Sequence, residues 1–355
     1  MQLRIVLPLA LICSIPALPA GAQPSQPRWR VGGDTQVSLR GRPDGLAATG
    51  VVIDSLIAAQ WDDGLQIVAR PVSRGRLDGS WHHALYQLGV RYHPPTRFPL
   101  RVEAGFLPPV FGLGLQRSRA LERDTGGLHP QYLRAIPGFE KGLPRLKSVS
   151  ASYPLAAVAV LGVSRVDIRL GVADGSPTRS RGVMRSTNPP RAPQLVVGAG
   201  VTPITGLRIG MTVVSGDYLR ADEAPDPSRG GRRATVSGAE LEYEFGHTSI
   251  VAEWIRASFD TSGAAAIASS GFVLVTHALS PRWRVGGRYD VATTPDASRV
   301  FAPDLGSLRL VEGLVAYRVT RELVLRGFVV AQHSFQSSEW DHEAGLSLAV
   351  SHRWW

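Results

Sequence analysis

The chain has 355 residues, a formal net charge of +10 at pH 7, and 44% hydrophobic residues. Its basic groups are spread along the whole length, which is typical of an anionic surface or an anion pathway. On this feature alone, the chain is also compatible with a basic soluble protein. After the N-terminal region, the longest clear apolar run is Leu155 to Val163. That run is half of the ~18 residues a membrane helix needs, which excludes a helical membrane protein.

The N-terminal region predicts a cleaved export signal. Arg4 precedes an apolar run, and Ala20-Gly21-Ala22 supplies the small residues of a cleavage site. We therefore predict a signal peptide at residues 1–22 and a single domain at residues 23–355. Cleavage removes Cys13, the only cysteine, and lowers the net charge by one to +9. A bulky residue before Cys13 disfavours the alternative of lipidation there, and export argues against a nucleic-acid partner.

Short alternating runs recur through the rest of the chain and predict an all-β fold, because side chains alternate faces along a strand. A weak run lies near Thr35 to Leu39. The fifteen clear runs are Val51 to Trp61, Leu65 to Arg70, His83 to His93, Leu100 to Phe106, Leu155 to Gly162, Val166 to Asp174, Gln194 to Thr202, Leu207 to Ser215, Thr235 to Phe245, Ser249 to Ala257, Ile267 to Leu279, Arg282 to Val291, Leu308 to Arg318, Leu323 to Val330 and Leu346 to Trp355.

The connections between these runs alternate between short and long. This asymmetry is typical of outer-membrane barrels, which have short periplasmic turns, longer extracellular loops and an even number of strands. Fifteen clear runs are an odd number, so an even-numbered barrel requires the weak run near Thr35 to Leu39 as a strand. The predicted total is sixteen strands. The predicted long connections are Val72 to Trp81, Leu107 to Leu146, Gly175 to Ala192, Gly216 to Arg233, Asp260 to Ala265, Ala292 to Gly306 and Ala331 to Ala344.

Face composition and aromatic placement favour a barrel over a soluble sandwich. In the run from Val166, the residues Val166, Ile168 and Leu170 share one face, while Asp167 and Arg169 share the other. Periodicity cannot tell which face is outside, but aromatic residues gather near the short turns, where they suit the edge of a bilayer. These aromatic residues are Trp61, Tyr92, Phe245, Trp283, Tyr317 and Trp354.

The connection from Leu107 to Leu146 shows no sustained period and is basic. A structureless segment of that length is uncommon in a compact domain unless it is functional. Six basic side chains stand against Glu122, Asp124 and Glu140, an excess of three. We predict that this third extracellular loop folds into the lumen. Its predicted pore-constriction residues are Arg117, Arg119, Arg123, Arg134, Lys141 and Arg145.

Charged residues on the polar faces of the strands are predicted to line the pore wall. The row Glu240, Glu242 and Glu244 has two readings: a solvated face, or a row that sits across from basic strands and sets up a transverse field. The predicted wall residues are Arg101, Glu103, Arg169, Arg208, Glu240, Glu242, Glu244, Arg284 and Arg288.

The segment Gly105-Phe106-Leu107-Pro108-Pro109-Val110-Phe111-Gly112-Leu113 resembles the strand-to-loop signature of the phosphate-selective (O and P type) and related outer-membrane porins. Leu279 to Trp283 and Ala316 to Thr320 are similar to the closing strands of this group. The resemblance implies a sixteen-stranded, usually trimeric pore with an infolded third loop. Two features depart from it: Lys141 and Lys147 are the only lysines, and the final Trp355 falls off the apolar face.

The sequence shows no catalytic constellation. There is no Gly-x-Ser-x-Gly elbow, and His342-Glu343 lacks a second histidine four residues on. His82 and His83 are adjacent, so they point to opposite faces of a strand and do not suit a metal. We expect no enzyme activity, no metal and no cofactor.

Together these observations predict an all-β transmembrane antiparallel barrel in the bacterial outer membrane. The predicted function is a porin for passive diffusion of small hydrophilic solutes with a mild preference for anions. The alternatives are a non-conducting structural or receptor-like barrel plugged by its third loop, and a periplasmic β-sandwich or solenoid. The expected partners are outer-membrane lipid, small anions and hydrophilic solutes, and copies of the chain in a homotrimer, with no nucleic acid.

Overall fold

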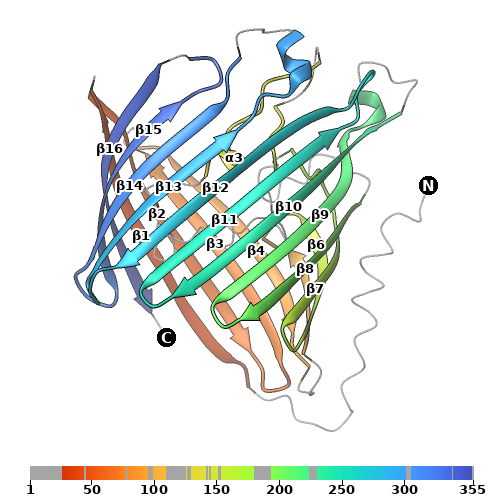
Figure 1. Ribbon diagram of the computed structural model, residues 1–355. Coiled ribbons are helices and arrows are strands. Elements are labelled where there is room, and N and C mark those ends of the chain that lie inside the picture. The colour runs from red at the N-terminus through yellow and green to blue at the C-terminus, as the bar shows by residue number, and fades with distance from the viewer. Residues whose placement is uncertain are drawn as a thin grey trace, which may run out of the picture.

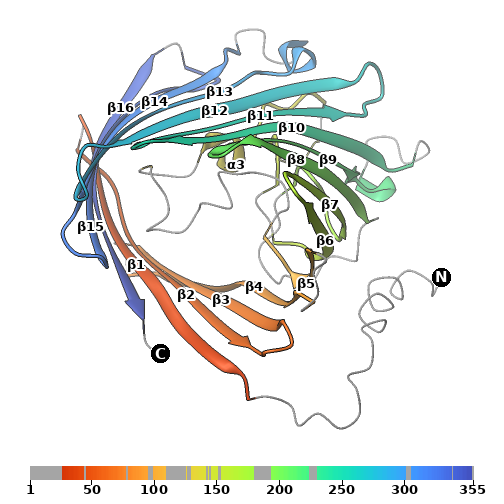
Figure 2. The same ribbon diagram turned by 60° about the horizontal axis from the view of Figure 1, so that its bottom comes forward.

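The computed structural model describes residues 26–43, 45–76, 79–94, 99–108, 125, 129–140, 143, 145–150, 153–179, 193–223, 230–300, 305–337 and 339–353. Their strands form a closed barrel, in which each strand pairs antiparallel with its sequence neighbours and β1 pairs with β16 (Figures 1 and 2). The strands are β1 (Arg28–Arg42), β2 (Gly45–Gln60), β3 (Leu65–Arg76), β4 (Trp81–Tyr92), β5 (Leu100–Phe106), β6 (Leu155–Val163), β7 (Val166–Ala173), β8 (Gln194–Ile204), β9 (Leu207–Leu219), β10 (Arg232–Phe245), β11 (Thr248–Phe259), β12 (Ala266–Ala278), β13 (Trp283–Ala292), β14 (Leu308–Arg318), β15 (Leu323–His333) and β16 (Trp340–Arg353).

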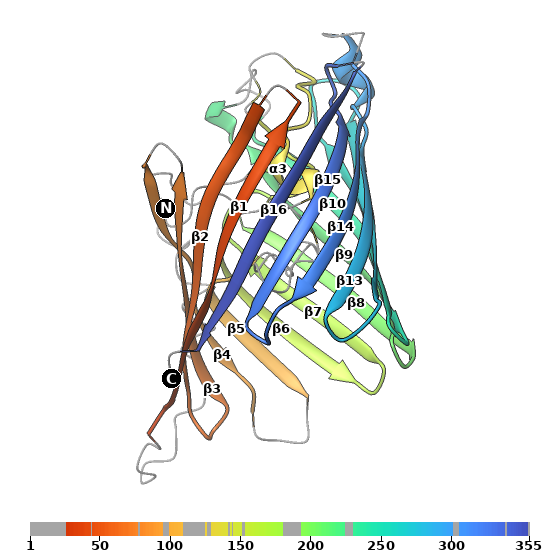
Figure 3. The ribbon, with the colours of Figure 1, turned by 90° about the vertical axis from the view of Figure 1, so that its left-hand side faces the viewer.

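The predicted sixteen-stranded antiparallel barrel is therefore confirmed. Figure 3 views the seam where β1 lies beside β16, with both strands inclined to the barrel axis, as closure of a sheet requires. Closure leaves no free sheet edge along this seam, since ten residues from Gly32 to Gly41 pair with Ala344 to Arg353. Short helical turns, α3 (Pro130–Leu133), η1 (Ala221–Glu223) and η3 (Asp296–Val300), lie in connections.

Burial along the strands tells which face points outward. On β9, Met211 and Val213 are 63% and 41% exposed, whereas Thr212 between them is 4% exposed. The same alternation places Ile168 outward and Arg169 inward on β7. The apolar face of the wall is thus outside and the charged face inside, the arrangement of barrels that lie in lipid.

Tight turns close one end of the barrel. Ser164 and Arg165 alone join β6 to β7, and Gly206 lies in the equally tight turn from β8 to β9. Gly64, between β2 and β3, has a φ of 89°, and a Cβ there would overlap the carbonyl oxygen of His93. Only glycine fits this turn, because it combines positive φ with close backbone approach.

At the opposite end, the connection between β3 and β4 is shorter than predicted. β3 continues to Arg76, through half of the predicted long connection from Val72 to Trp81. The reason is a register shift between Arg70 and Pro71, where a β-bulge interrupts the alternation of side chains.

Aromatic side chains gather at the end with the tight turns, as predicted. Trp283 and Tyr317 pair across β13 and β14 with ring centroids 4.7 Å apart. Tyr243 stacks on Phe245 at 4.9 Å, and Phe245 is 46% exposed on the outer face. Trp61 and Tyr92 lie at the same end, while Trp354 lies outside the described residues.

The largest apolar cluster joins strands β8 to β12 to the end of the third connection. From the wall it includes Val214, Tyr218, Val236, Ile255 and Phe259, all buried. From the connection it includes Tyr132, Ile136, Phe139, Leu146 and Val149. This sector of the inner wall is therefore apolar, and we call these five wall residues the apolar seat.

Candidate functional site: the charged inner wall

The charged residues predicted to line the wall share the inward-facing side of their strands. Arg101 and Glu103 lie on β5, Arg169 on β7, Arg208 on β9, and Glu240, Glu242 and Glu244 on β10. Arg284 and Arg288 lie on β13. The structure brings several of them together in three groups. Their role in a pore stays a prediction.

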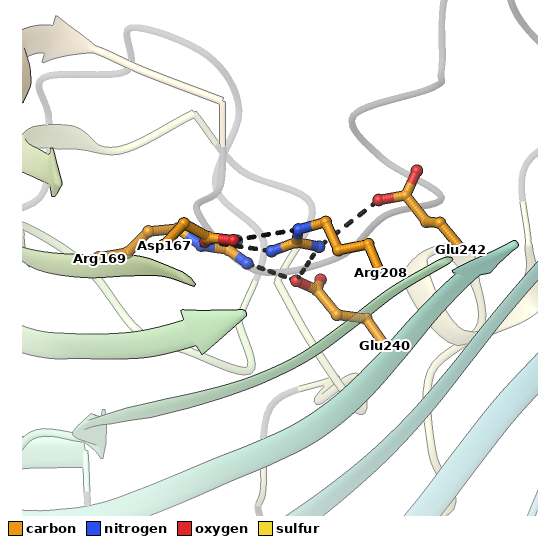
Figure 4. Close-up of polar contacts among 5 residues, drawn as sticks. All are labelled: Asp167, Arg169, Arg208, Glu240 and Glu242. Atoms are coloured by element: carbon orange, nitrogen blue, oxygen red, sulfur yellow. Dashed lines mark hydrogen bonds and ion pairs between the residues drawn. The ribbon is translucent and has the colours of Figure 1, made fainter. Parts of the chain in front are cut away.

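The first group, which we call the charge network, consists of Asp167, Arg169, Arg208, Glu240 and Glu242 on β7, β9 and β10 (Figure 4). Arg208 lies at its centre. Its Nη1 is 2.8 Å from Glu240 Oε1 and 3.5 Å from Glu242 Oε1, and its Nη2 is 3.2 Å from Asp167 Oδ1. Arg169 contacts Glu240 and lies 3.3 Å from Asp167 Oδ1. Two guanidinium groups thus face three carboxylates.

The glutamate row lies next to a basic group on the same wall, because β9, which carries Arg208, pairs with β10, and a transverse field set up by the row stays a prediction. Glu242 is the direct cross-strand partner of Arg208, so the two are neighbours on the wall. Neighbouring strands lie about 4.8 Å apart, which an arginine side chain easily spans. Glu244, at the strand end, is exposed. Lateral pairing with Arg169 and Arg208 therefore offsets part of the charge that the row would otherwise present.

The second group lies near the tight turns. Arg91 Nε and Arg101 Nε each lie 2.9 Å from Glu103 Oε1, so two cations share one carboxylate. His93 follows β4 at this end. Burial, together with the nearby Arg101 and Arg91, lowers its pKa below the usual 6.5. A neutral imidazole at pH 7 follows, and the positive balance of this group comes from the two arginines.

The third group is the most buried and reaches the third connection. Arg288 pairs with Asp290 at 3.0 Å and with Glu312 at 2.8 Å. His129 Nδ1 lies 2.7 Å from Asp290 Oδ1, and its ring stacks on Phe272 with centroids 3.6 Å apart. This group therefore ties the residue before α3 to the wall at β12 and β13.

Polar contacts also attach the rest of the described connection to the wall. The Tyr132 hydroxyl donates to Glu253 Oε2 of β11 at 2.6 Å. Glu140 pairs with Arg232 of β10 and accepts from Ser262, whose backbone N–H lies 3.0 Å and whose hydroxyl 2.6 Å away. Burial raises the pKa of Glu140, but the hydrogen bonds from Ser262 and the charge of Arg232 outweigh it, and the pKa is lowered overall.

Lys147 forms a hydrogen bond within the third connection. Its Nζ donates to the backbone oxygen of Tyr132 at 2.9 Å, and burial lowers its pKa. Apolar packing adds further contacts: the ring of Phe139 lies 5.0 Å from that of Phe259 and 6.5 Å from that of Tyr218. The connection is therefore anchored mainly by buried aromatic contacts with the apolar seat and by a few polar bonds.

Of the predicted constriction residues, Arg134 and Arg145 are described, and both are exposed. Arg117, Arg119, Arg123 and Lys141 lie outside the described residues. The sequence reasoning missed His129, Tyr132, Glu253, Glu312 and Arg232. Their contacts join segments at least 92 residues apart or depend on register. The one available signal was an aromatic and a histidine within an otherwise basic connection.

Two features are absent from the described part of the chain. No group of three or more histidine, cysteine, aspartate or glutamate residues within it is arranged to hold a metal ion. None of its helices is long and apolar enough to cross a membrane.

Comparison with solved structures gives consistent similarities over nearly the whole chain. The trimer form of OmpT, an outer membrane protein of Vibrio cholerae, matches with a TM-score of 0.59 and 10% identity over 92% of this chain and 99% of that one. The outer membrane channel DcaP of Acinetobacter baumannii matches with a TM-score of 0.59 and 10% identity over 93% and 98%. A mutant of Rh. blastica porin matches with a TM-score of 0.54 and 10% identity over 91% and 100%.

No protein-family model matches the sequence, and no curated protein matches it. At about a tenth identical residues, the structural likeness shows the fold. The chain folds as a sixteen-stranded barrel of the outer-membrane porin type.

Proposed function

We propose that the protein is an outer-membrane channel for passive diffusion of small hydrophilic solutes. The observation that carries the proposal is the closed barrel whose outer face is apolar and whose inner face holds charged groups. A pore lined by polar groups and held in lipid conducts small solutes without chemistry at the wall. The fold shared with a channel and a porin supports the same function.

We further propose that the third connection narrows the pore. Its described residues are bound to inward-facing side chains of β10 to β13, through Tyr132, His129 and Glu140. Arg134 and Arg145 of the same connection are exposed, so their charges are available to passing solutes. Such a segment sets the radius and the charge of the narrowest point.

A mild preference for anions follows from comparing the wall with the connection. The wall arginines of the charge network are outnumbered by carboxylates: the network holds two guanidinium groups and three carboxylates, so it adds no positive charge to the wall. The sequence of the third connection carries an excess of three positive charges. Two charges 4 Å apart interact by about 4 kcal/mol at an effective dielectric near 20 and about 1 kcal/mol in bulk water, so confined charges dominate. Phosphate selectivity is not expected with only two lysines.

The expected partners follow from this proposal. Outer-membrane lipid would cover the apolar outer face, and the resemblance to trimeric porins, together with the trimer form of OmpT, supports a homotrimer. The alternative is a barrel that the third connection plugs, which the apolar seat favours because it fixes that connection to one sector of the wall.

Planar-bilayer recording of the refolded protein distinguishes these functions. We expect discrete conductance steps and a reversal potential that favours chloride over potassium at low salt and fades at about 1 M, where the Debye length is about 3 Å. Arg134→Glu combined with Arg145→Glu should reduce the preference for chloride. Cation preference in the unmodified channel would contradict the assignment of selectivity to the third connection.

A further inference from the structure

Two glycines lie beneath the charge network. Cross-strand register places Asp167 beside Gly200, Gly200 beside Gly210, and Gly210 beside Glu240, on β7 to β10 in turn. With strands about 4.8 Å apart, this row is about 14 Å long. Asp167 and Glu240 therefore stand at the two ends of a row whose middle positions carry no side chain.

The side chains of the network fill the space that the glycines leave. A Cβ at position 200 would meet the Asp167 carboxylate and would lie 2.5 Å from Nη2 and 3.0 Å from Cζ of Arg208. A Cβ at position 210 would meet the Glu240 carboxylate and would lie 2.7 Å from its Cγ. Arg208 can therefore reach both Asp167 and Glu240 while lying against the wall only because both positions are glycine.

We propose that Gly200 and Gly210 are determinants of pore width and charge exposure: they form a floor on which the charge network lies flat, with its two cations paired to its carboxylates. The inference rests on the proposed channel function for its effect on conduction, but the packing that it describes does not. Side-chain exposure fits a network held against the wall, with Glu240 at 7% and Arg169 at 10%.

The nature of the contacts predicts what an added methyl group does. At both positions the contacted atoms belong to the side chains of Asp167, Arg208 and Glu240, whose outer parts can turn about several bonds. The strands can therefore stay in place while these side chains move toward the barrel axis, the one direction that the wall leaves open. A cation and two carboxylates would then separate, narrow the lumen and become available to passing ions.

The test uses Gly200→Ala and Gly210→Ala, with Gly162→Ala as the matched control. Gly162 lies on the inner face of β6 and pairs with Asp167 from the other side, yet no atom lies within 4 Å of its Cβ position. All three variants add one methyl group to the same level of the wall. If one of the two test variants fails to refold, the other still tests the proposal.

The first readout is modification of Arg208 by phenylglyoxal in the refolded barrel, followed by mass spectrometry. We expect faster modification in Gly200→Ala and Gly210→Ala than in the unmodified protein and in Gly162→Ala. This measurement does not need an open channel, so it decides the packing even if the unmodified protein does not conduct. Equal rates in all four proteins would overturn the proposal.

The second readout is single-channel conductance, which we expect to be lower in both test variants and unchanged in Gly162→Ala. The effect of Gly200→Ala on conductance should be smaller in the background of Arg208→Ala, because one of the two side chains that the methyl group displaces, Arg208, is then absent and only Asp167 remains. Faster modification with unchanged conductance would refute the role in pore width. A silent unmodified protein would refute the channel function and leave the modification result standing.

Discussion

At the scale of single residues, the inner wall is defined by arginines that are matched with carboxylates. Taking a charge out of water costs several kcal/mol, and removing one partner of a buried pair leaves the other uncompensated. Glu240 is the most sensitive point of the charge network because it receives both Arg169 and Arg208 while its own side chain is only 7% exposed.

Glu240→Gln should therefore destabilise the barrel by roughly 3 to 5 kcal/mol, the usual cost of breaking a buried ion pair. Glu244→Gln is the matched control on the same strand, because Glu244 is exposed and its substitution should change stability by about 0.5 kcal/mol or less. Urea unfolding of the refolded proteins measures both. Similar values for the two variants would contradict the assigned role of Glu240.

The lipid-facing residues give a second prediction, which depends on depth. Val213 lies in the middle of β9 and faces outward, so Val213→Arg should cost roughly 2 to 4 kcal/mol. Ile204 is 54% exposed at the end of β8, and Ile204→Arg should cost about 0 to 1 kcal/mol. Unfolding in lipid vesicles measures the difference. Equal tolerance of the two arginines would mean that no hydrocarbon covers this face.

At the scale of elements, the third connection is held differently from what its composition suggests. The sequence predicts a basic loop, and Glu140 and His129 of this connection do pair with charged groups of the wall. The larger part of its buried contact is apolar, however, through Tyr132, Ile136 and Phe139 on the apolar seat. Apolar burial of this kind is insensitive to salt, so the connection should keep its place at high ionic strength.

Phe139→Ala should loosen this attachment, since truncating a buried phenylalanine typically costs about 3 to 5 kcal/mol. The expected result is faster tryptic cleavage after Arg134 and Arg145 while the barrel stays folded. Leu133→Ala is the control, because Leu133 lies in α3 of the same connection but is 51% exposed. Unchanged cleavage in Phe139→Ala would show that the apolar seat does not hold the connection.

Acid should loosen the same connection through Glu140. Its pKa is lowered in the folded protein, so its contribution to stability is present above the usual value of 4.5 and is lost as the pH falls through the folded pKa. Hydrogen exchange of residues 129–140 should therefore lose protection at acidic pH more steeply in the native protein than in Glu140→Gln. Identical pH profiles would remove Glu140 from the attachment.

The sequence predicts the strands well where only one face is apolar, as in the run from Val166. The sequence predicts β1 shorter than it is, because Gly33 and Thr35 fall on the same side of the strand as Val37 and Leu39 and weaken the apolar pattern there. It also loses the second half of β3, because the bulge at Pro71 inverts the alternation. The apolar seat could not be recognised, since strands with Val214 inside and Val213 outside are apolar on both faces.

The pairing within the charge network could not be predicted for a different reason. Which side chains meet depends on the register between strands that are not joined by a tight turn, such as β9 and β10. Composition alone leaves Glu242 free to face either a neighbour or the far wall. Only the register, which sets Glu242 opposite Arg208, decides that the charges cancel locally.

At the scale of the whole molecule, the closed strand order and the alternation of faces produce a lumen lined by matched charges. The third connection is attached to the sector of β10 to β13, while the charge network lies on β7 to β10. In the proposed channel, the exposed positive charge of the described part of this connection lies on Arg134 and Arg145.

The most direct test of this account is the conductance of the refolded, membrane-inserted protein in a planar bilayer. Folding is first verified by the heat-dependent shift in electrophoretic mobility, so that a silent sample can be interpreted. We expect discrete, salt-dependent conductance steps from the unmodified barrel. A correctly folded and inserted barrel that gives no steps would contradict the channel and leave the plugged barrel in its place.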